Sequence, residues 1–310
     1  MKKILHVILI SIFSLTVISC AKKSSDDSST TSSGLFVVVG DSGTILTSSD
    51  GTTWTSRTSG TSNGLYNIFY GNSTFVAVGH SGTILTSSDG TTWTSRTSGT
   101  SEHLYGITYG NSTFVVAGDN DSGSVGTILT SSDGITWVSR TSGTTNDLWD
   151  VNYGNNTFVA SDSTGGIITS SDGISWTSRV GIDTYGIWGG AYGNSKFVVA
   201  SFGGHILTSS DGTTWTSRTS GSTSVLSDVA YGNSQFAAVG DGGTAITSSD
   251  GTSWSTQTTG TTTNFIGLTY GNSMWVIVGE SGNIHTSDGE TLTSRTSGTT
   301  VTLVRVIYKE

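Results

Sequence analysis

Two aspartates of this sequence, Asp150 and Asp228, are placed where a pair of carboxylates could act on a sugar. Each lies three residues before a Tyr-Gly pair, at the start of a short segment with strand character. If the two segments line one channel, the carboxylates could serve as the acid and the base or nucleophile of glycoside hydrolysis. The alternative interpretation is that both side chains are solvated at the polar starts of strands.

Metal-binding patterns are weak in this chain. Four histidines stand in separate repeats without a spacing such as His-x-x-x-His, at His80, His103, His205 and His285. The stretch from Asp119 to Gly123 resembles the start of a calcium loop, but its glycine comes one place early and no glutamate follows at the required distance. We therefore expect no metal site and no cofactor, and we leave calcium at residues 119–124 as the open alternative to a plain polar loop.

A short motif recurs along the chain, in its fullest form Thr-Ser-Ser-Asp-Gly-Thr-Thr-Trp. Its aspartate returns every 38 to 44 residues, at Asp50, Asp89, Asp133, Asp172, Asp211, Asp250 and Asp288. That interval suits four short strands with their turns and is too short for strand and helix units. Although the chain has 43 glycines and no proline, aromatic and β-branched residues return in fixed register, which disordered segments lack. An all-β repeat protein is predicted.

The unit from residue 104 to 141 illustrates the predicted strands. They cover residues 104–109, 113–117, 127–130 and a stretch from Trp137 to Arg140. Between the first two, Gly110-Asn111 suits a two-residue hairpin turn with glycine first. The same Tyr-Gly-Asn turn recurs six times in the chain.

The two ends of the repeat region decide between an open stack and a ring. Residues 35–40 match the second strand of a repeat, and residues 303–308 match its first strand. Each end is therefore an incomplete unit, and together they make one complete unit. An open stack would leave both fragments with bare edges, so the sequence predicts a closed seven-bladed β-propeller over residues 34–310, in which the C-terminal first strand pairs with the N-terminal strands.

The recurring motif has residues suited to a tight turn. The aspartate can accept backbone N–H groups, the glycine supplies a positive φ, and the tryptophan can fill the seam between sheets. The motif resembles the Asp-box, or BNR-like repeat, of a broad group of propellers that includes sialidases and sortilin-like receptors. The stretch Val39-Gly40-Asp41-Ser42-Gly43-Thr44-Ile45-Leu46 is most similar to the photosystem II assembly-factor propellers.

This resemblance covers roughly residues 35–308 and implies the propeller fold, with the box aspartates in structural roles. The seventh box is a weakened copy, since it is one residue short before Asp288 and has Leu292 where the other boxes have tryptophan.

Sialidase activity is the enzymatic possibility that the resemblance raises, and it would require three arginines that grip one carboxylate. Six arginines lie seven residues after a box aspartate, on the outer strands of different blades, at Arg57, Arg96, Arg140, Arg179, Arg218 and Arg295. They cannot converge, and only Arg305 is on an inner strand. We expect the outer arginines to cover neighbouring tryptophan faces or acidic residues.

The repeats differ most on the face opposite the boxes, and this difference indicates a ligand site. Four residues before the strand tyrosine, four consecutive repeats have an aromatic residue, at Tyr66, Tyr105, Trp149 and Trp188, and the other three have Ser227, Ile266 and Val304. The aromatic residues are predicted to form a crescent at the channel mouth, bordered by Asp41, His80, His103, Asp119, Asp150 and Asp162. Such rings could stack on sugars or an apolar peptide. The alternative is blade packing, because two residues further the same parity holds Ile68, Ile107, Val151 and Gly190.

The N-terminal residues give a predicted cellular address. Lys2 and Lys3 precede an apolar run, and Val17-Ile18-Ser19-Cys20 resembles the lipobox of bacterial lipoproteins. This resemblance implies a signal peptide over residues 1–20, a lipid on Cys20, and a polar tether over residues 21–33. Because Ala21 rather than aspartate follows, we expect the outer membrane, on either side of it.

Charge and composition narrow the partners. The formal net charge of −9 becomes more negative by two once Lys2 and Lys3 are removed, which disfavours nucleic acid. The sequence thus predicts an envelope-anchored, non-catalytic binding or assembly module, a monomer that takes a protein or glycan. The alternative is a hydrolase that acts on glycans.

Overall fold

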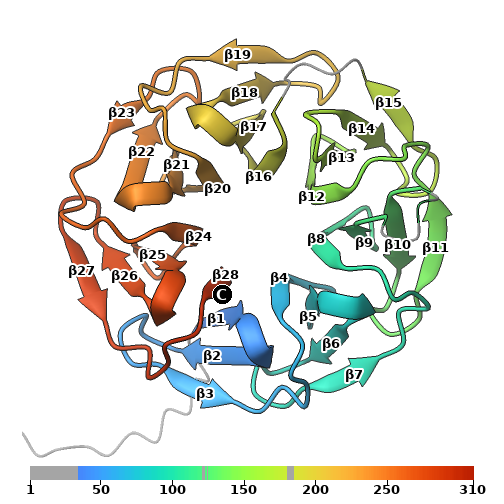
Figure 1. The fold of residues 1–310 in the computed structure, drawn as a ribbon, viewed down its shortest axis with the longest axis horizontal. Helices are drawn as coiled ribbons and strands as arrows, with labels where there is room; N and C mark the ends of the chain where they lie inside the picture. The colour runs from blue at the N-terminus through green and yellow to red at the C-terminus, as the bar shows by residue number, and fades with distance from the viewer. Residues whose placement is uncertain (1–33, 121–122, 124, 180–184) are drawn as a thin grey trace, which may run out of the picture. The chain divides into compact units, whose positions relative to one another are not determined.

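The computed structural model describes residues 34–120, 123, 125–179 and 185–310, and the predicted signal peptide, Cys20 and tether lie outside them. The described residues form seven four-stranded antiparallel sheets, arranged as blades of a ring around a central opening (Figure 1). We number the blades along the chain, so that blade 1 contains β28, β1, β2 and β3, and blade 7 contains β24 to β27.

The inner strand of each blade lies next to the central opening. From blade 1 to blade 7 these strands are β28 (Leu303–Lys309), β4 (Leu65–Gly71), β8 (Leu104–Gly110), β12 (Leu148–Gly154), β16 (Ile187–Gly193), β20 (Leu226–Gly232) and β24 (Phe265–Gly271). The second strands are β1 (Leu35–Gly40), β5 (Thr74–Gly79), β9 (Thr113–Gly118), β13 (Thr157–Asp162), β17 (Lys196–Ser201), β21 (Gln235–Gly240) and β25 (Met274–Gly279).

The third strands carry the residues before each box. They are β2 (Thr44–Ser48), β6 (Ile84–Ser87), β10 (Thr127–Ser131), β14 (Ile167–Ser170), β18 (Ile206–Ser209), β22 (Thr244–Ser248) and β26 (Ile284–Ser287). The outer strands are short, β3 (Thr55–Arg57), β7 (Thr94–Arg96), β11 (Val138–Thr141), β15 (Thr177–Arg179), β19 (Thr216–Arg218), β23 (Ser255–Thr256) and β27 (Leu292–Arg295).

Among the described residues, five short 3-10 turns join second and third strands. They are η1 (Asp41–Gly43), η2 (His80–Gly82), η3 (Phe202–Gly204), η4 (Asp241–Gly243) and η5 (Glu280–Gly282). All five lie at the end of the ring where the inner strands begin, since for example Gly79, just before η2, pairs with Leu65, the first residue of β4.

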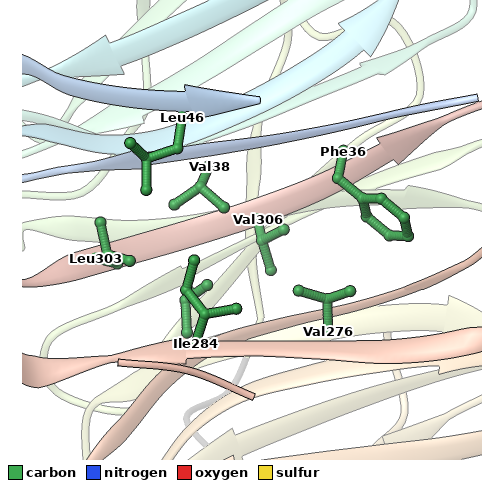
Figure 2. Close-up of a cluster of buried hydrophobic side chains, with 8 residues drawn as sticks. Phe36, Val38, Leu46, Val276, Ile284, Leu303 and Val306 are labelled. Atoms are coloured by element: carbon green, nitrogen blue, oxygen red, sulfur yellow. The ribbon is translucent and has the colours of Figure 1, made fainter. Parts of the chain in front are cut away.

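The ring is closed as the sequence predicts. β28 pairs antiparallel with β1, so that Leu35 lies opposite Lys309 and Val38 opposite Val306. The join is buried, because Val38, Leu303 and Val306 pack with Val276 and Ile284 of blade 7 in one apolar cluster (Figure 2). The N-terminal strand β1 therefore has an antiparallel partner on each side, β28 and β2, and its inner edge is paired.

The hairpin between inner and second strands differs by one residue from the prediction. Gly110 pairs with Thr113 across the ladder, so the two loop residues are Asn111 and Ser112. Both have positive φ, 45° and 56°, as a type I′ turn requires. The glycine is needed for space instead, since a Cβ on Gly110 would clash with the ring of Tyr153 in the next blade.

The boxes form hydrogen-bonded turns between third and outer strands. At Asp89, one carboxylate oxygen accepts the N–H groups of Thr91 and Thr92 at 2.8 and 2.9 Å and the hydroxyl of Ser87 at 2.9 Å. These bonds hold the pKa of Asp89 well below its usual range. Trp93 then packs into the seam with the preceding blade, against a cluster that contains Val37.

The outer arginines make a different contact from the expected one. In each of the six blades that has this arginine, its Nε donates to a threonine hydroxyl of the neighbouring third strand, as Arg96 does to Thr86 at 2.8 Å. This hydrogen bond thus links the outer strand to the third strand of the same blade.

Candidate functional site: the aromatic mouth of the channel

A β-bulge opens every inner strand. In blade 2, Leu65 pairs with Gly79 and Asn67 pairs with Val78, which leaves Tyr66 without a ladder partner. The same register shift occurs in all seven blades, and the bulge residues are Tyr66, Tyr105, Trp149, Trp188, Ser227, Ile266 and Val304. A bulge redirects the side chain that it carries. The alternative of blade packing assumed that Tyr66 shares a face with Ile68, and the bulge removes this parity: Ile68 is in the core, and Tyr66 is only partly buried.

The seven bulge residues surround one cavity. Together with Asn67 and Arg305 they line a space of about 430 Å³ at the end of the channel where the inner strands begin. Trp188 is 44% exposed, and the other three aromatic rings are partly buried. The predicted crescent thus exists as four consecutive aromatic residues, faced by Ser227, Ile266 and Val304 on the remaining blades.

The tyrosine side of the mouth is polar. The rings of Tyr66 and Tyr105 stack at 5.2 Å with an interplanar angle of 20°. At the rim, the rings of His80 and His103 lie 4.0 Å apart, and Nδ1 of His103 accepts the backbone N–H of Ser81 at 3.1 Å. Burial, together with the negative charges of Asp41 and Asp119, raises the pKa of Tyr66. This side therefore presents hydroxyl and imidazole groups.

The tryptophan side of the mouth is apolar. The rings of Trp149 and Trp188 lie 5.3 Å apart, and Phe202 of η3 approaches Trp188 edge-on at 5.5 Å. Tyr185 is 46% exposed and lies against His205 at 4.7 Å. Sequence reasoning missed Phe202 as a neighbour of the two mouth tryptophans. The signal for Phe202 was available, because the other repeats have Asp, His or Glu at this loop position.

Two of the predicted bordering carboxylates shape loops. Asp119 and Asp162 are each 4% exposed. Asp119 accepts the backbone N–H of His103 at 2.7 Å and the hydroxyl of Tyr105 at 3.4 Å. Asp162 accepts the backbone N–H groups of Gly166 at 2.6 Å and Thr164 at 2.9 Å. Asp41, in contrast, is partly exposed at the rim.

A ring of alternating polar residues and glycines lies directly behind the bulge. One residue after each bulge residue the blades have Asn67, Gly106, Asp150, Gly189, Asp228, Gly267 and Arg305. The glycines leave room for their neighbours. A Cβ on Gly106 would lie 2.8 Å from Cα of Asp150, and a Cβ on Gly189 would lie 2.9 Å from Cα of Asp228.

An ion pair crosses this ring. Arg305 Nη1 lies 2.5 Å from Oδ1 of Asp228, whose carboxylate also accepts the N–H groups of Val229 at 2.9 Å and Leu268 at 3.0 Å. Burial raises the pKa of Asp228 to about 6, even though the charge of Arg305 acts in the opposite direction. Burial likewise raises the pKa of Asp150, which accepts the amide of Asn152 at 2.7 Å.

The positions of Asp150 and Asp228 do not suit hydrolysis of a bound glycan. Their exposed fractions are 3% and 0%, so they are not the solvated residues of the alternative interpretation either. Neither is among the residues that line the mouth cavity, which ends at Asn67 and Arg305. A glycosidase needs both carboxylates in reach of the sugar and a water between or beside them. This pair instead balances the charge of Arg305.

Among the described residues, no three His, Cys, Asp or Glu side chains are grouped closely enough to hold a metal ion. Residues 121, 122 and 124 of the calcium-like loop lie outside the described part of the chain, and Asn120 donates from its side chain to the carbonyl of Thr145 at 2.8 Å. The same part of the chain contains no helix long and apolar enough to span a membrane.

Comparison with known proteins supports the fold. No protein-family model matches the chain, and no curated protein matches its sequence. Among solved structures, YCF48 from Cyanidioschyzon merolae is similar with a TM-score of 0.61 and 16% identity over 77% of this chain and 87% of that one. YCF48 bound to D1 peptide gives 0.60 and 17% identity, over 75% and 81% of the two chains.

A computationally designed protein, Ika8, is also similar, with a TM-score of 0.61 and 15% identity over 88% of each chain. The YCF48 structures agree with the resemblance to assembly-factor propellers that the sequence indicates. At these identities the similarity concerns the fold, and the site must be argued from its own residues.

Proposed function

We propose that this protein is a non-catalytic binding or assembly module that holds a protein or glycan ligand in the aromatic mouth. The observation that carries the proposal is the single cavity lined by all seven bulge residues. Its four aromatic residues bring large faces to a partly open space, where stacking on a sugar or an apolar side chain is favourable.

A peptide is the ligand we favour. The tryptophan side offers an apolar surface, and the tyrosine side offers the rings of Tyr66, Tyr105 and His103, whose centroids lie 5.2 to 6.4 Å from one another. An extended peptide has both apolar side chains and backbone groups to match them. Among the structural neighbours, one is YCF48 bound to D1 peptide, which supports this choice over a glycan.

The ligand test uses an array of linear peptides and a glycan array, probed with residues 34–310. We expect binding to peptides that have an aromatic or aliphatic residue, and loss of that binding in Trp149→Ala and Trp188→Ala. Ile135→Ala is the matched control, because Ile135 is 49% exposed and lies on a box turn at the opposite end of the blades. Binding that survives both tryptophan variants would contradict the mouth as the site.

The hydrolase alternative is tested with the same protein. Release of product from any member of the glycan panel, lost in Trp188→Ala but not in Ile135→Ala, would replace binding with catalysis. Since Asp150 and Asp228 are buried in the polar ring, we expect no release.

We further propose that the propeller is anchored by a lipid on Cys20 in the bacterial envelope, at the outer membrane. The support is the sequence pattern of residues 17–20. Detergent-phase partitioning of the full chain tests it: the native protein should enter the detergent phase, and Cys20→Ala should not. A Cys20→Ala protein that still partitions into detergent would show that the anchor lies elsewhere.

A further inference from the structure

Six of the seven seams between blades are filled by the indole ring of a box tryptophan. These residues are Trp54, Trp93, Trp137, Trp176, Trp215 and Trp254, and each packs against the apolar cluster that it shares with the preceding blade. In five of them the indole Nε1 donates to the carbonyl of the box glycine at 3.0 to 3.2 Å. The six seams therefore show what the repeat normally places there.

The seam between blade 6 and blade 7 departs from this pattern on both sides. On blade 6, Ala237 stands where six repeats have valine, and Ala245 stands where six have isoleucine. On blade 7, Leu292 stands where the other boxes have tryptophan, and His285 replaces a leucine or isoleucine. The two alanines and Leu292 remove apolar volume from the same seam, and His285 makes it more polar beside Phe265. Trp275 stands where the other repeats have phenylalanine, and its larger ring returns only part of the lost volume.

A cavity of about 380 Å³ results. Its apolar lining includes Ala237, Ala245, Trp275, Ile277 and Leu292. The cavity is open at the outer side, because Ala245 and Thr247 are partly exposed, whereas the equivalent Ile45 and Thr47 of blade 1 are 0% and 2% exposed.

The rim of this seam cavity is polar. Gln257, which replaces the outer-strand arginine of the other blades, donates to the hydroxyl of Thr247 at 2.9 Å. Glu290 and several hydroxyl groups complete the rim, and no lysine or arginine is among the described residues that line it. An anionic ligand is therefore disfavoured.

We propose that the seam cavity between blades 6 and 7 binds a small molecule with a planar bicyclic aromatic ring of indole size. The six other seams show that this space accepts an indole between two sheets, and here the ring is missing from the chain. Trp275 offers an aromatic face for packing, the alanines and Ile277 offer apolar contacts, and the hydroxyl and amide groups of the rim can receive a polar substituent or ring N–H. This site is separate from the aromatic mouth.

The test is thermal unfolding of residues 34–310 in the presence of indole. At an indole concentration of about ten times the Kd, the midpoint should rise by roughly 3 °C. Leu292→Trp should raise the midpoint without indole and should remove the indole-dependent shift, because its own ring fills the seam. Thr291→Trp is the matched control, since Thr291 is exposed beside it, and it should keep the shift.

Two further variants complete the design. Trp188→Ala removes an aromatic ring of the mouth and should keep the indole-dependent shift, which separates this site from the proposed function. The double variant Ala237→Val, Ala245→Ile narrows the cavity without adding an aromatic ring, so it should reduce the indole-dependent shift of the midpoint. It tests the site independently if Leu292→Trp does not fold. N-acetyl-tryptophanamide should bind at least tenfold more weakly than indole, because its backbone has no room in the seam. No shift with indole, or a shift retained by the filled variants, would overturn the proposal.

Discussion

Arg305 is the residue on which the polar ring depends. Its side chain is 20% exposed, and that of Asp228, its partner, is 1% exposed. Removing the cation would leave a buried carboxylate whose remaining partners are two backbone N–H groups. We expect Arg305→Met to destabilise the propeller by about 3 kcal/mol, the lower end for a broken buried pair because Arg305 still reaches solvent. Urea unfolding measures this loss.

A second substitution gives the control for Arg305. Asp228→Asn in the Arg305→Met background removes the uncompensated charge, so the double variant should recover part of the lost stability. An Arg305→Met variant as stable as the native protein would show that the ion pair between Arg305 and Asp228 does not contribute to stability.

His285 gives a prediction that depends on pH. Its Nδ1 is buried and has no hydrogen-bond partner in the described part of the chain, and burial lowers its pKa below the ordinary value of 6.5. The unfolded chain takes up this proton as the pH falls through 6.5, while the folded protein resists it, so stability is present above that pH and declines below it. His285→Leu should stabilise the domain by about 1 kcal/mol at pH 8 and by more at pH 5.5.

The matched change is made in an intact seam. Leu85 occupies the equivalent position of blade 2 and is 1% exposed, so Leu85→His should lose stability and acquire the same dependence on pH. Parallel stability curves for the native protein and His285→Leu between pH 8 and 5.5 would contradict this account.

At the scale of one element, two residues stabilise the box turn in different ways, one by hydrogen bonds and the other by packing. Asp89 is exposed and closes the turn with three hydrogen bonds, whereas Trp93 is partly buried in the seam. Asp89→Ala should cost about 1 kcal/mol, and Trp93→Ala about 2 to 3 kcal/mol, below the 3 to 5 of a fully buried ring. Leu292→Ala in the incomplete seam should cost less than Trp93→Ala. Equal losses for Trp93→Ala and Leu292→Ala would mean that both seams are packed alike.

The strands could be predicted from the sequence because the same pattern of strand residues recurs in every repeat at the same positions. The alternation of side chains along a strand could not predict the bulge, because a period of two residues places Tyr66 and Ile68 on the same face. The extra residue is visible only when Leu65 and Asn67 are seen to pair with consecutive residues of β5. The sequence shows that the four aromatic residues share one position of the repeat, and the backbone irregularity decides where their side chains lie.

For the whole molecule, closure through β28 gives the strongest expectation. Deleting residues 303–310 would remove the inner strand of blade 1 and expose Val38 and Phe36, which are now fully buried. The single cooperative transition in thermal or urea unfolding should be lost. A truncated protein with the midpoint of the intact one would rule out any role of this strand in stability.

A circular permutant is the control for this deletion. Leu35 pairs with Lys309, so a short linker can join the two ends, and the ring can be opened at Gly221, which is exposed and has no neighbour that a Cβ would meet. This permutant keeps β28 paired and should unfold cooperatively.

Closure and blade number could be read from the sequence because the first and last strands match different parts of one repeat. The polar ring could not be predicted from the sequence, because its glycines and charged residues come from seven positions that are far apart in sequence and become neighbours only in the closed ring. Asp150 and Asp228 attract notice as a catalytic pair in the sequence, and their burial beside Arg305 becomes clear only in the closed ring.

The bulge at the start of every inner strand bears on how such a protein can diversify. Its residue is skipped in the pairing register and lies outside the alternating faces, so the seams do not dictate its identity. One molecule already holds tyrosine, tryptophan, serine, isoleucine and valine there, on the same register. The bulge residue of a duplicated blade can therefore be substituted with little loss of stability. Seven independent choices around one mouth allow a propeller to acquire a new specificity by point mutation while its architecture stays unchanged.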